Sequence, residues 1–184
     1  MKQIYIINGS GTSGKDTFVE KISKYMPCCK YSIIDLCKEA ATVLGCNVND
    51  KTEKTRKFLS DLKDLSANYN DIPFKDVISV VIDFKCNLVD YEVLFIDMRD
   101  PDDIKRAVEL LDAKTILVRR PSAIKITSNH ADANVENYNY DYIIENNGTI
   151  EQLENIAKMM VKEIKSGNTM LKNHKPVTYI GIEY

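Results

Sequence analysis

Three features are absent from the 184-residue sequence: a long hydrophobic run, an excess of charge of one sign, and cysteines paired as C-x-x-C. A membrane-spanning helix needs roughly 18 to 20 consecutive apolar residues, so the first absence predicts a chain without one. The residues after Met1–Gln3 form a strand-like run instead of the hydrophobic stretch of a signal peptide. We therefore expect a cytoplasmic protein that does not bind membranes.

The charges nearly cancel, with 25 Lys and Arg against 27 Asp and Glu, which gives a formal net charge of -2. Such a chain has no overall attraction for nucleic acid, so any anion site must be local. The cysteines number five, and an odd count without C-x-x-C indicates neither a disulfide framework nor a zinc cluster. We expect reduced and mostly buried thiols at Cys28, Cys29, Cys37, Cys46 and Cys86.

Short apolar runs alternate with stretches of helical periodicity. With 44% hydrophobic and 28% charged residues, the composition suits one globular domain. The apolar runs predict five strands buried on both faces of a parallel sheet, at Ile4–Ile7, Tyr31–Ile34, Val93–Ile96, Thr115–Val118 and Tyr140–Ile144. Apolar residues three and four apart predict helices over 18–26, 36–44, 58–69, 77–84, 104–111 and 153–164. The alternation predicts an α/β fold with three layers, α/β/α.

Two helices have clear start signals. Asp100-Pro101 is an N-cap residue followed by proline, whose missing N–H costs nothing at the first helical position. Thr149 and Gln152 have the spacing of a capping box. The predicted domain is 1–166, with a helical insertion at about 47–86, a lid at about 120–139 and a C-terminal tail at 167–184. Residues 177–184 could form a strand or a flexible end.

The strongest motif is Gly9-Ser-Gly-Thr-Ser-Gly-Lys15, which fits G-x-x-x-x-G-K between an apolar strand and an amphipathic helix. Glycines and small hydroxyl residues let successive backbone N–H groups surround a phosphate, and the helix N-terminus adds partial positive charge. The Lys15 ammonium then reaches the outer phosphates of a nucleotide. The predicted nucleotide-binding residues here are Gly9, Gly11, Thr12, Ser13, Gly14, Lys15, Asp16 and Thr17.

The position after the lysine departs from the motif, because Asp16 stands where Ser or Thr binds Mg²⁺. A carboxylate there can bind the metal directly or through water, or position the nucleophile. It can also be an ordinary acid that the dipole favours at a helix start. We assign Asp16 a catalytic and metal-binding role.

A second carboxylate follows the strand Val93–Ile96. Asp97 lies at the strand end beside the predicted phosphate loop, where an acid would hold hydrated Mg²⁺. Arg99 follows two residues later and can reach a phosphate, or pair with a neighbouring acid. We expect Asp97 and Arg99 to be catalytic, and Arg99 also to bind the acceptor.

Phosphoryl transfer needs cations around the moving group and a cover that excludes water. Arg119 and Arg120 directly follow a predicted strand, and about twenty polar residues follow them. We expect Arg120 to be catalytic and Arg119 to bind the nucleotide. Lys125 and His130 could add donors, but a solvated surface position is the favoured interpretation of each. With no cysteine beyond Cys86, this lid cannot be a four-cysteine zinc lid.

Two further segments offer ligands. The inserted helices carry a group of basic residues, and most residues of such a group ordinarily face solvent. From this group we choose Arg56 to bind an acceptor phosphate. Asn146-Asn147-Gly148 follows the fifth strand as a turn, and its amides can also face a purine edge. From this turn we choose Asn147 and Gly148 as nucleotide-binding residues.

Together these motifs resemble the P-loop kinases in which G-K-D-[ST] replaces G-K-[ST], as in phage-type deoxynucleoside monophosphate kinases; animal-type phosphomevalonate kinases are similar there. Ile34–Ala40 resembles the family's stretch around L-K-[ED]-A, and Asp97–Pro101 its D-x-R-x-P element. Val118–Arg120 resembles the lid arginine, and Asp141–Thr149 the closing strand and turn. His130–Asp132 resembles an H-x-x-E region, with the acid one position early. The resemblance covers about 160 residues.

The resemblance implies ATP and Mg²⁺ as cofactors and a (deoxy)nucleoside monophosphate as acceptor, bound in part by Asp35 and Lys38. Two alternatives remain open: a P-loop kinase for another small acceptor, of the phosphomevalonate or dephospho-coenzyme A type, or a nucleotide-binding regulator without transferase activity. The absence of an N-K-x-D sequence speaks against a GTPase. The oligomeric state is open, a homodimer included.

Overall fold

The computed structural model describes residues 2–50, 52–121, 135–167 and 176–180, and the chain divides into two compact units. The first unit consists of Met1–Lys30 and Asp90–Tyr184, and the second of Tyr31–Val89. The limits expected from the sequence, 1–166 with an insertion at 47–86 and a lid at 120–139, stay predictions. Residues 122–134 of that lid lie outside the described residues.

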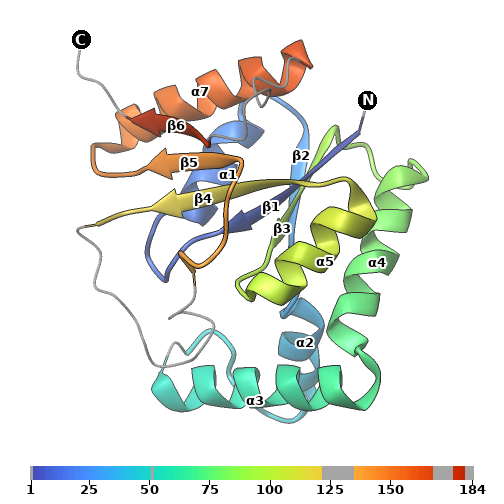
Figure 1. The fold of residues 1–184 in the computed structure, drawn as a ribbon. Coiled ribbons are helices and arrows are strands. Elements are labelled where there is room, and N and C mark those ends of the chain that lie inside the picture. Colours follow the sequence, from blue (N-terminus) through green and yellow to red (C-terminus); the bar gives the residue numbers. More distant parts are fainter. Residues whose placement is uncertain (1, 51, 122–134, 168–175, 181–184) are drawn as a thin grey trace. The chain divides into compact units, whose positions relative to one another are not determined.

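The first unit is built on a six-stranded sheet with the order β2-β3-β1-β4-β5-β6 (Figure 1). Strand β1 pairs in parallel with β3 and β4, β4 with β5, and β5 with β6. The strands are β1 (Gln3–Asn8), β2 (Cys28–Ser32), β3 (Val93–Asp97), β4 (Lys114–Arg119), β5 (Tyr142–Glu145) and β6 (Val177–Ile180). The α/β class with a parallel sheet is therefore confirmed.

The expected count of five strands is wrong, because Val177–Ile180 forms a sixth strand that pairs with β5. Its burial alternates: Val177 and Tyr179 pack against the core, whereas Thr178 and Ile180 are exposed. The sequence left a strand and a flexible end open for this segment, and these four residues form the strand. An alternation of two over only four residues is too short a signal to distinguish a strand from a flexible end by sequence alone.

The second strand is also displaced from its expected place. It runs over Cys28–Ser32 instead of Tyr31–Ile34, and Ile33 and Ile34 form a turn before α2 (Asp35–Val43). The apolar pair misled the assignment because Ile33 is buried in a turn. Only Cys28 and Ser32 of the true strand are buried, so this strand has no continuous apolar run that the sequence could show.

Helices cover both faces of this sheet. Tyr5 and Ile7 of β1 share one buried cluster with residues of α1 (Lys15–Ser23) and α7 (Ile150–Ser166). Ile4 and Ile6 face the opposite side, since side chains alternate along a strand, and both are buried. Helix α5 (Pro101–Leu111) contacts β1, and Figure 1 shows it in front of the sheet with α1 behind. The first unit thus has the three layers expected from the alternation.

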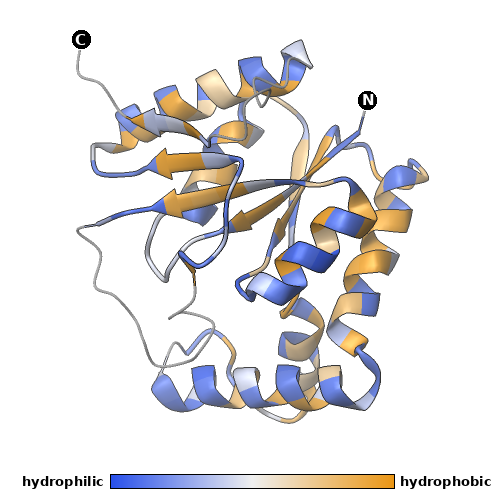
Figure 2. Cartoon of the chain, in the orientation of Figure 1, coloured by the Kyte–Doolittle hydropathy of each residue, from blue (hydrophilic) through white to orange (hydrophobic). Residues whose placement is uncertain are grey.

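The hydropathy pattern agrees with this layering. Strands β1, β3, β4 and β5 are mostly hydrophobic, as strands buried on both faces are, whereas α5 and α7 carry both kinds of residue (Figure 2). Both helix-start signals are confirmed. Asp100 Oδ1 accepts from Asp102 N at 2.9 Å, and Thr149 and Gln152 form the reciprocal capping box.

The second unit contains helices in the described residues between 35 and 85. They are α2, α3 (Glu53–Asn70) and α4 (Ile72–Lys85), which contact one another. Thr52 caps α3 by accepting from Thr55 N at 3.2 Å, and Asp71, with a φ of 54°, makes the turn into α4. The two expected inserted helices are α3 and α4. No helix in the described part of the chain is long and apolar enough to cross a membrane.

Candidate active site

The loop from Gly9 to Gly14 joins the carboxyl end of β1 to the first turn of α1. Phe18 N donates to Gly14 O at 2.8 Å as the first bond of this helix. The amides of the first turn before it, which begins at Lys15, have no carbonyl partner within the helix. These donors and the partial positive charge of the helix end make the loop suited to a phosphate.

Gly14 is fixed by its backbone conformation and by a neighbour. Its φ is 93°, and a Cβ on it would lie 2.3 Å from Asn146 Nδ2. That amide donates to Ser13 O at 2.8 Å, and Asn146 is 7% exposed. The residue that holds the loop is therefore Asn146. Its neighbours Asn147 and Gly148, which we expected to face a nucleotide, are exposed, and their role stays a prediction.

The start of the loop is held by Asn8, the last residue of β1. Its Oδ1 accepts from Gly9 N at 2.7 Å, and its Nδ2 donates to Arg99 O at 3.3 Å and to Tyr140 Oη at 2.7 Å. Tyr140 in turn donates to Val135 O. Burial raises the pKa of Tyr140, although the hydrogen bond from Asn8 opposes the shift, so this hydroxyl stays protonated as a donor. Asn8 thus ties the loop to the ends of two other strands.

Close approach explains Gly9 as well. A Cβ on it would lie 2.5 Å from both Val118 O and Ser13 Oγ. Ser13 Oγ is buried and has no hydrogen-bond partner among the described residues. Thr12 is exposed with a φ of 66°, whereas Gly11 and Thr17 are half-buried. The loop is therefore tightly packed at its base and open at Thr12.

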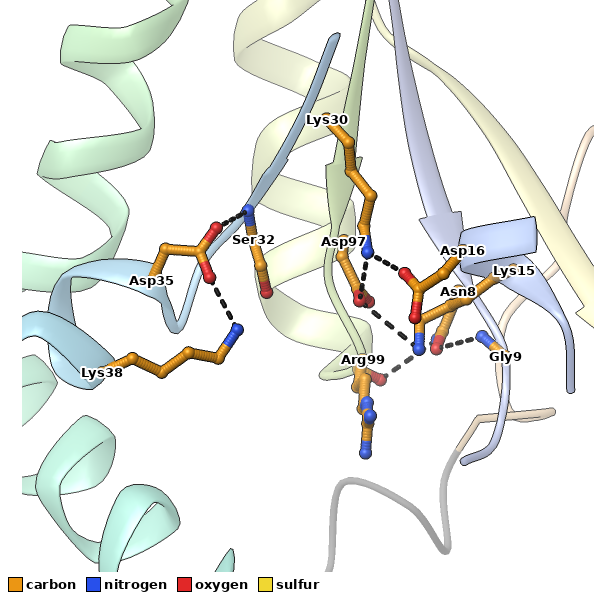
Figure 3. Close-up of polar contacts among 10 residues, drawn as sticks. All are labelled: Asn8, Gly9, Lys15, Asp16, Lys30, Ser32, Asp35, Lys38, Asp97 and Arg99. Atoms are coloured by element: carbon orange, nitrogen blue, oxygen red, sulfur yellow. Dashed lines mark hydrogen bonds and ion pairs between the residues drawn. The ribbon is translucent and has the colours of Figure 1, made fainter. Parts of the chain in front are cut away.

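Two ammonium groups and two carboxylates meet beside the loop (Figure 3). Lys15 Nζ lies 3.4 Å from Asp97 Oδ2, and both side chains are close to fully buried. Lys30 Nζ lies 3.7 Å from the same oxygen and forms an ion pair with Asp16. The structure thus brings Lys15, Asp16 and Asp97 together as expected and adds Lys30 of β2, which the sequence did not single out.

The carboxylates fit a hard divalent cation. Asp97 Oδ1 is buried and has no hydrogen-bond partner in the described part of the chain. Carboxylate oxygens are the protein ligands that Mg²⁺ takes, usually one or two of them, with water and phosphate completing the shell. The described residues contain no group of three or more His, Cys, Asp or Glu placed to hold a metal alone. Asp16 and Asp97 would therefore hold Mg²⁺ together with a phosphate ligand.

The arginines lie at strand ends near this site. Arg99 follows β3 and is half-buried, and Figure 3 shows its side chain pointing away from Asp97. Arg119 ends β4 and donates from Nε to Glu145 Oε1 at 3.0 Å; this bond raises the pKa of the guanidinium. Arg120 is exposed directly after β4. Their catalytic and nucleotide-binding roles stay predictions, and Lys125, His130 and Asp132 lie outside the described residues.

Of the residues expected to bind an acceptor, Arg99 lies in the first unit, whereas Asp35, Lys38 and Arg56 lie in the second. Asp35 accepts from Ser32 N at 2.8 Å and from Lys38 Nζ at 2.7 Å. Arg56 is half-buried in the first turn of α3, where its N donates to Thr52 O at 3.0 Å. An acceptor-binding role of Asp35, Lys38 and Arg56 stays a prediction.

Sequence reasoning missed three residues of the site: Asn8, Lys30 and Asn146. A usable signal existed for Asn8, because it is a polar residue at the end of an apolar run and directly before the loop. Asn146 belongs to the turn named from the sequence, but Asn147 and Gly148 were chosen from that turn, and nothing in the sequence separates Asn146 from Asn147. Lys30 reaches the site only through the pairing order of the strands.

Comparisons with known proteins find distant similarity to solved structures. No protein-family model and no curated protein matches the sequence. One similar structure is a shikimate kinase from Aquifex aeolicus vf5, with a TM-score of 0.46 and 11% identity, covering 90% of this chain and all of that one. Another is an LAO/AO transport system kinase, with a TM-score of 0.35 and 14% identity, covering 96% of this chain and 52% of that one. Both TM-scores are too low to carry an argument about function.

Proposed function

We propose that this chain is an ATP- and Mg²⁺-dependent phosphotransferase whose acceptor is a (deoxy)nucleoside monophosphate. One observation carries the proposal: the Lys15 ammonium lies at the start of α1, 3.4 Å from Oδ2 of the largely buried Asp97 side chain, next to a loop of backbone donors. An ammonium, a helix N-terminus and a metal-binding carboxylate in one place match the charge pattern of a bound nucleoside triphosphate.

Each part has a role in the proposed reaction. The loop amides and Lys15 bind the outer phosphates of ATP, and Lys15 stabilises the charge that develops on the transferred group. Asp16 and Asp97 hold Mg²⁺, which, when bound, neutralises charge on the phosphate oxygens. Arg99 and Arg120 supply further positive charge. Arg119, Asn147 and Gly148 contact the nucleotide, and Asp35, Lys38 and Arg56 bind the acceptor.

The test is a transfer assay with a panel of acceptors. Purified protein is incubated with ATP, Mg²⁺ and each deoxynucleoside or nucleoside monophosphate, and ADP is compared with an ATP-only control. We expect acceptor-dependent ADP and the corresponding diphosphate with at least one monophosphate. Separate arms with phosphomevalonate and dephospho-coenzyme A test the other small acceptors. Slow hydrolysis that no acceptor changes would refute a transferase and favour a regulator.

The role of Arg120 has its own readout. If its guanidinium stabilises charge only during transfer, Arg120→Ala lowers kcat and kcat/KM together and leaves KM for ATP nearly unchanged. A matched control is Arg106→Ala, a charge removal on α5 of the same unit. A change confined to KM would assign Arg120 to ground-state binding instead.

A further inference from the structure

Lys30 is a residue of β2 that no motif accounts for. Its ammonium forms an ion pair with Asp16 and lies 3.7 Å from Asp97 Oδ2. That oxygen also lies 3.4 Å from Lys15 Nζ, so two cations share it. All four residues belong to the first unit, and Figure 3 shows Lys30 reaching across from its strand to both carboxylates.

We propose that Lys30 is a displaceable counter-ion, which holds Asp16 and Asp97 in the free protein and releases both carboxylates when a divalent cation binds them. The identification of these carboxylates as a cation site rests on the proposed function. Lys30 is then a positioning residue: it keeps the two carboxylates close to their metal-binding places and sets how strongly the site takes a metal without nucleotide.

The two lysines differ in a way that separates their roles. The Lys15 side chain is 8% exposed at the first position of α1, whereas the Lys30 side chain is 28% exposed. The flexible side chain of Lys30 is partly exposed, so its ammonium can move into water. The Lys15 side chain is buried, so its ammonium can reach water only if the packing around it is disrupted. The cation that leaves is therefore Lys30.

Asp97 also has a carboxylate oxygen that is not in use as a hydrogen-bond acceptor. Its Oδ1 is buried without a hydrogen-bond partner among the described residues, while Oδ2 faces both ammonium groups. A metal that binds Oδ1 displaces no hydrogen bond there. Coordination by Asp97 and Asp16 together brings the metal close to the Lys30 ammonium, and because a divalent cation and an ammonium repel each other at short range, Lys30 must move away.

A direct test measures Mn²⁺ binding in the absence of nucleotide and acceptor, from the electron paramagnetic resonance signal of free Mn²⁺. Wild type is compared with Lys30→Met and with Lys24→Met, a control that removes the same charge from the same unit at a lysine paired with Glu154. We expect Lys30→Met to bind Mn²⁺ about tenfold more tightly, the size that Coulomb's law in bulk water gives for divalent and monovalent cations about 6 Å apart. Lys24→Met should match wild type.

The outcomes are decisive in both directions. Equal Mn²⁺ affinities of wild type and Lys30→Met, whether measurable or both below detection, would overturn the proposal. An equal gain in Lys24→Met would also overturn it, because the effect would then come from net charge alone. Circular dichroism spectra and thermal melts establish that both variants are folded.

A second measurement needs no variant. Wild-type protein is acetylated at its lysines with and without Mg²⁺, and modification of Lys30 and Lys24 is quantified by mass spectrometry. Release of Lys30 predicts faster acetylation of Lys30 with Mg²⁺ and no change at Lys24; an unchanged Lys30 rate contradicts release.

Neither measurement uses ATP turnover. A metal-dependent Lys30 without transferase activity would refute the proposed function only, and transferase activity with unchanged Mn²⁺ binding would refute the counter-ion role only.

Discussion

The hydrogen bond from Asn146 to the phosphate loop gives a prediction with a matched control in the next residue. Asn146 Nδ2 donates to Ser13 O at 2.8 Å in a buried setting. Asn146→Ala removes the donor and leaves a buried carbonyl without its partner. The backbone bond from Asn146 N to Arg119 O is unchanged by this substitution. Asn147→Ala makes the same chemical change at an exposed side chain.

The expected size follows from burial. A buried acceptor left without its hydrogen bond costs about 1 to 3 kcal/mol, whereas a surface substitution stays within about 0.5 kcal/mol. For a chain of this length, each kcal/mol moves the melting temperature by about 2 to 4 °C. We therefore expect Asn146→Ala to lower the melting temperature by roughly 4 to 8 °C for a loss of about 2 kcal/mol, with Asn147→Ala close to wild type.

Thermal unfolding followed by circular dichroism measures this difference, and calorimetric titration with ADP adds a second readout. Asn146→Ala should also weaken ADP binding, because the Ser13 carbonyl loses the hydrogen bond from Asn146 that holds the loop in place. Asn147→Ala should weaken ADP binding without a change in stability if its side chain contacts the nucleotide as the sequence predicts. Equal melting temperatures of the two variants would refute the assignment of Asn146 as the residue that holds the loop.

Three further predictions concern the charges and thiols. Lys15→Ala should lower turnover by about 10² to 10³-fold and still fold, since Lys30 remains beside Asp97; near-normal turnover would refute the mechanism. The hydrogen bond from Tyr25, together with neighbouring lysines, lowers the pKa of Glu154 to about 2, so the stability it adds is full above the ordinary glutamate pKa of about 4 and is lost as pH falls through about 2. The melting-temperature gap between wild type and Glu154→Gln should therefore be constant near pH 7 and shrink in that acid range; a gap that persists at pH 2 would contradict it. Burial raises the pKa of Cys28 to about 11, whereas Cys86 is exposed. Iodoacetamide should thus modify Cys86 first, and equal rates in the folded protein would disprove the burial of Cys28.

Features that are local in the chain could be predicted from the sequence. The capping box at Thr149 and the helix start at Asp100-Pro101 are each formed by residues within four positions of one another. Such interactions can therefore be recognised from the order of residues in the sequence. The strand before the loop and the acid at the end of β3 were found for the same reason. The sixth strand was left open because its four residues are stabilised by pairing with β5, and that pairing does not appear in their own sequence.

Features that depend on which strands are neighbours could not be predicted. Lys30 contacts Asp97 because β2 lies next to β3 in the sheet. The sequence around residue 30 does not indicate that β2 is placed beside β3 in the sheet. The hydrogen bond between Asn146 and Ser13 is a second example, because the two residues are 133 positions apart in the chain. Both interactions form only when the chain has folded and brought distant segments together. The predicted phosphate loop could be found from sequence because its seven residues are consecutive.

Under the proposed function, the ion pair with Lys30 gives a reason for Asp16 at the position where the motif has Ser or Thr. A Ser or Thr at position 16 would leave Lys15 and Lys30 with Asp97 alone, a group with one net positive charge. With Asp16 the four side chains are two cations and two anions, and their charges cancel. A chain of net charge -2 has no long-range attraction for phosphate. Under the proposed function, the positive charge for the phosphates therefore comes from the helix end, the loop amides, Lys15 and a metal that binds together with the nucleotide. Under the proposed function, a neutral group that exchanges Lys30 for Mg²⁺ gains positive charge only when the metal binds.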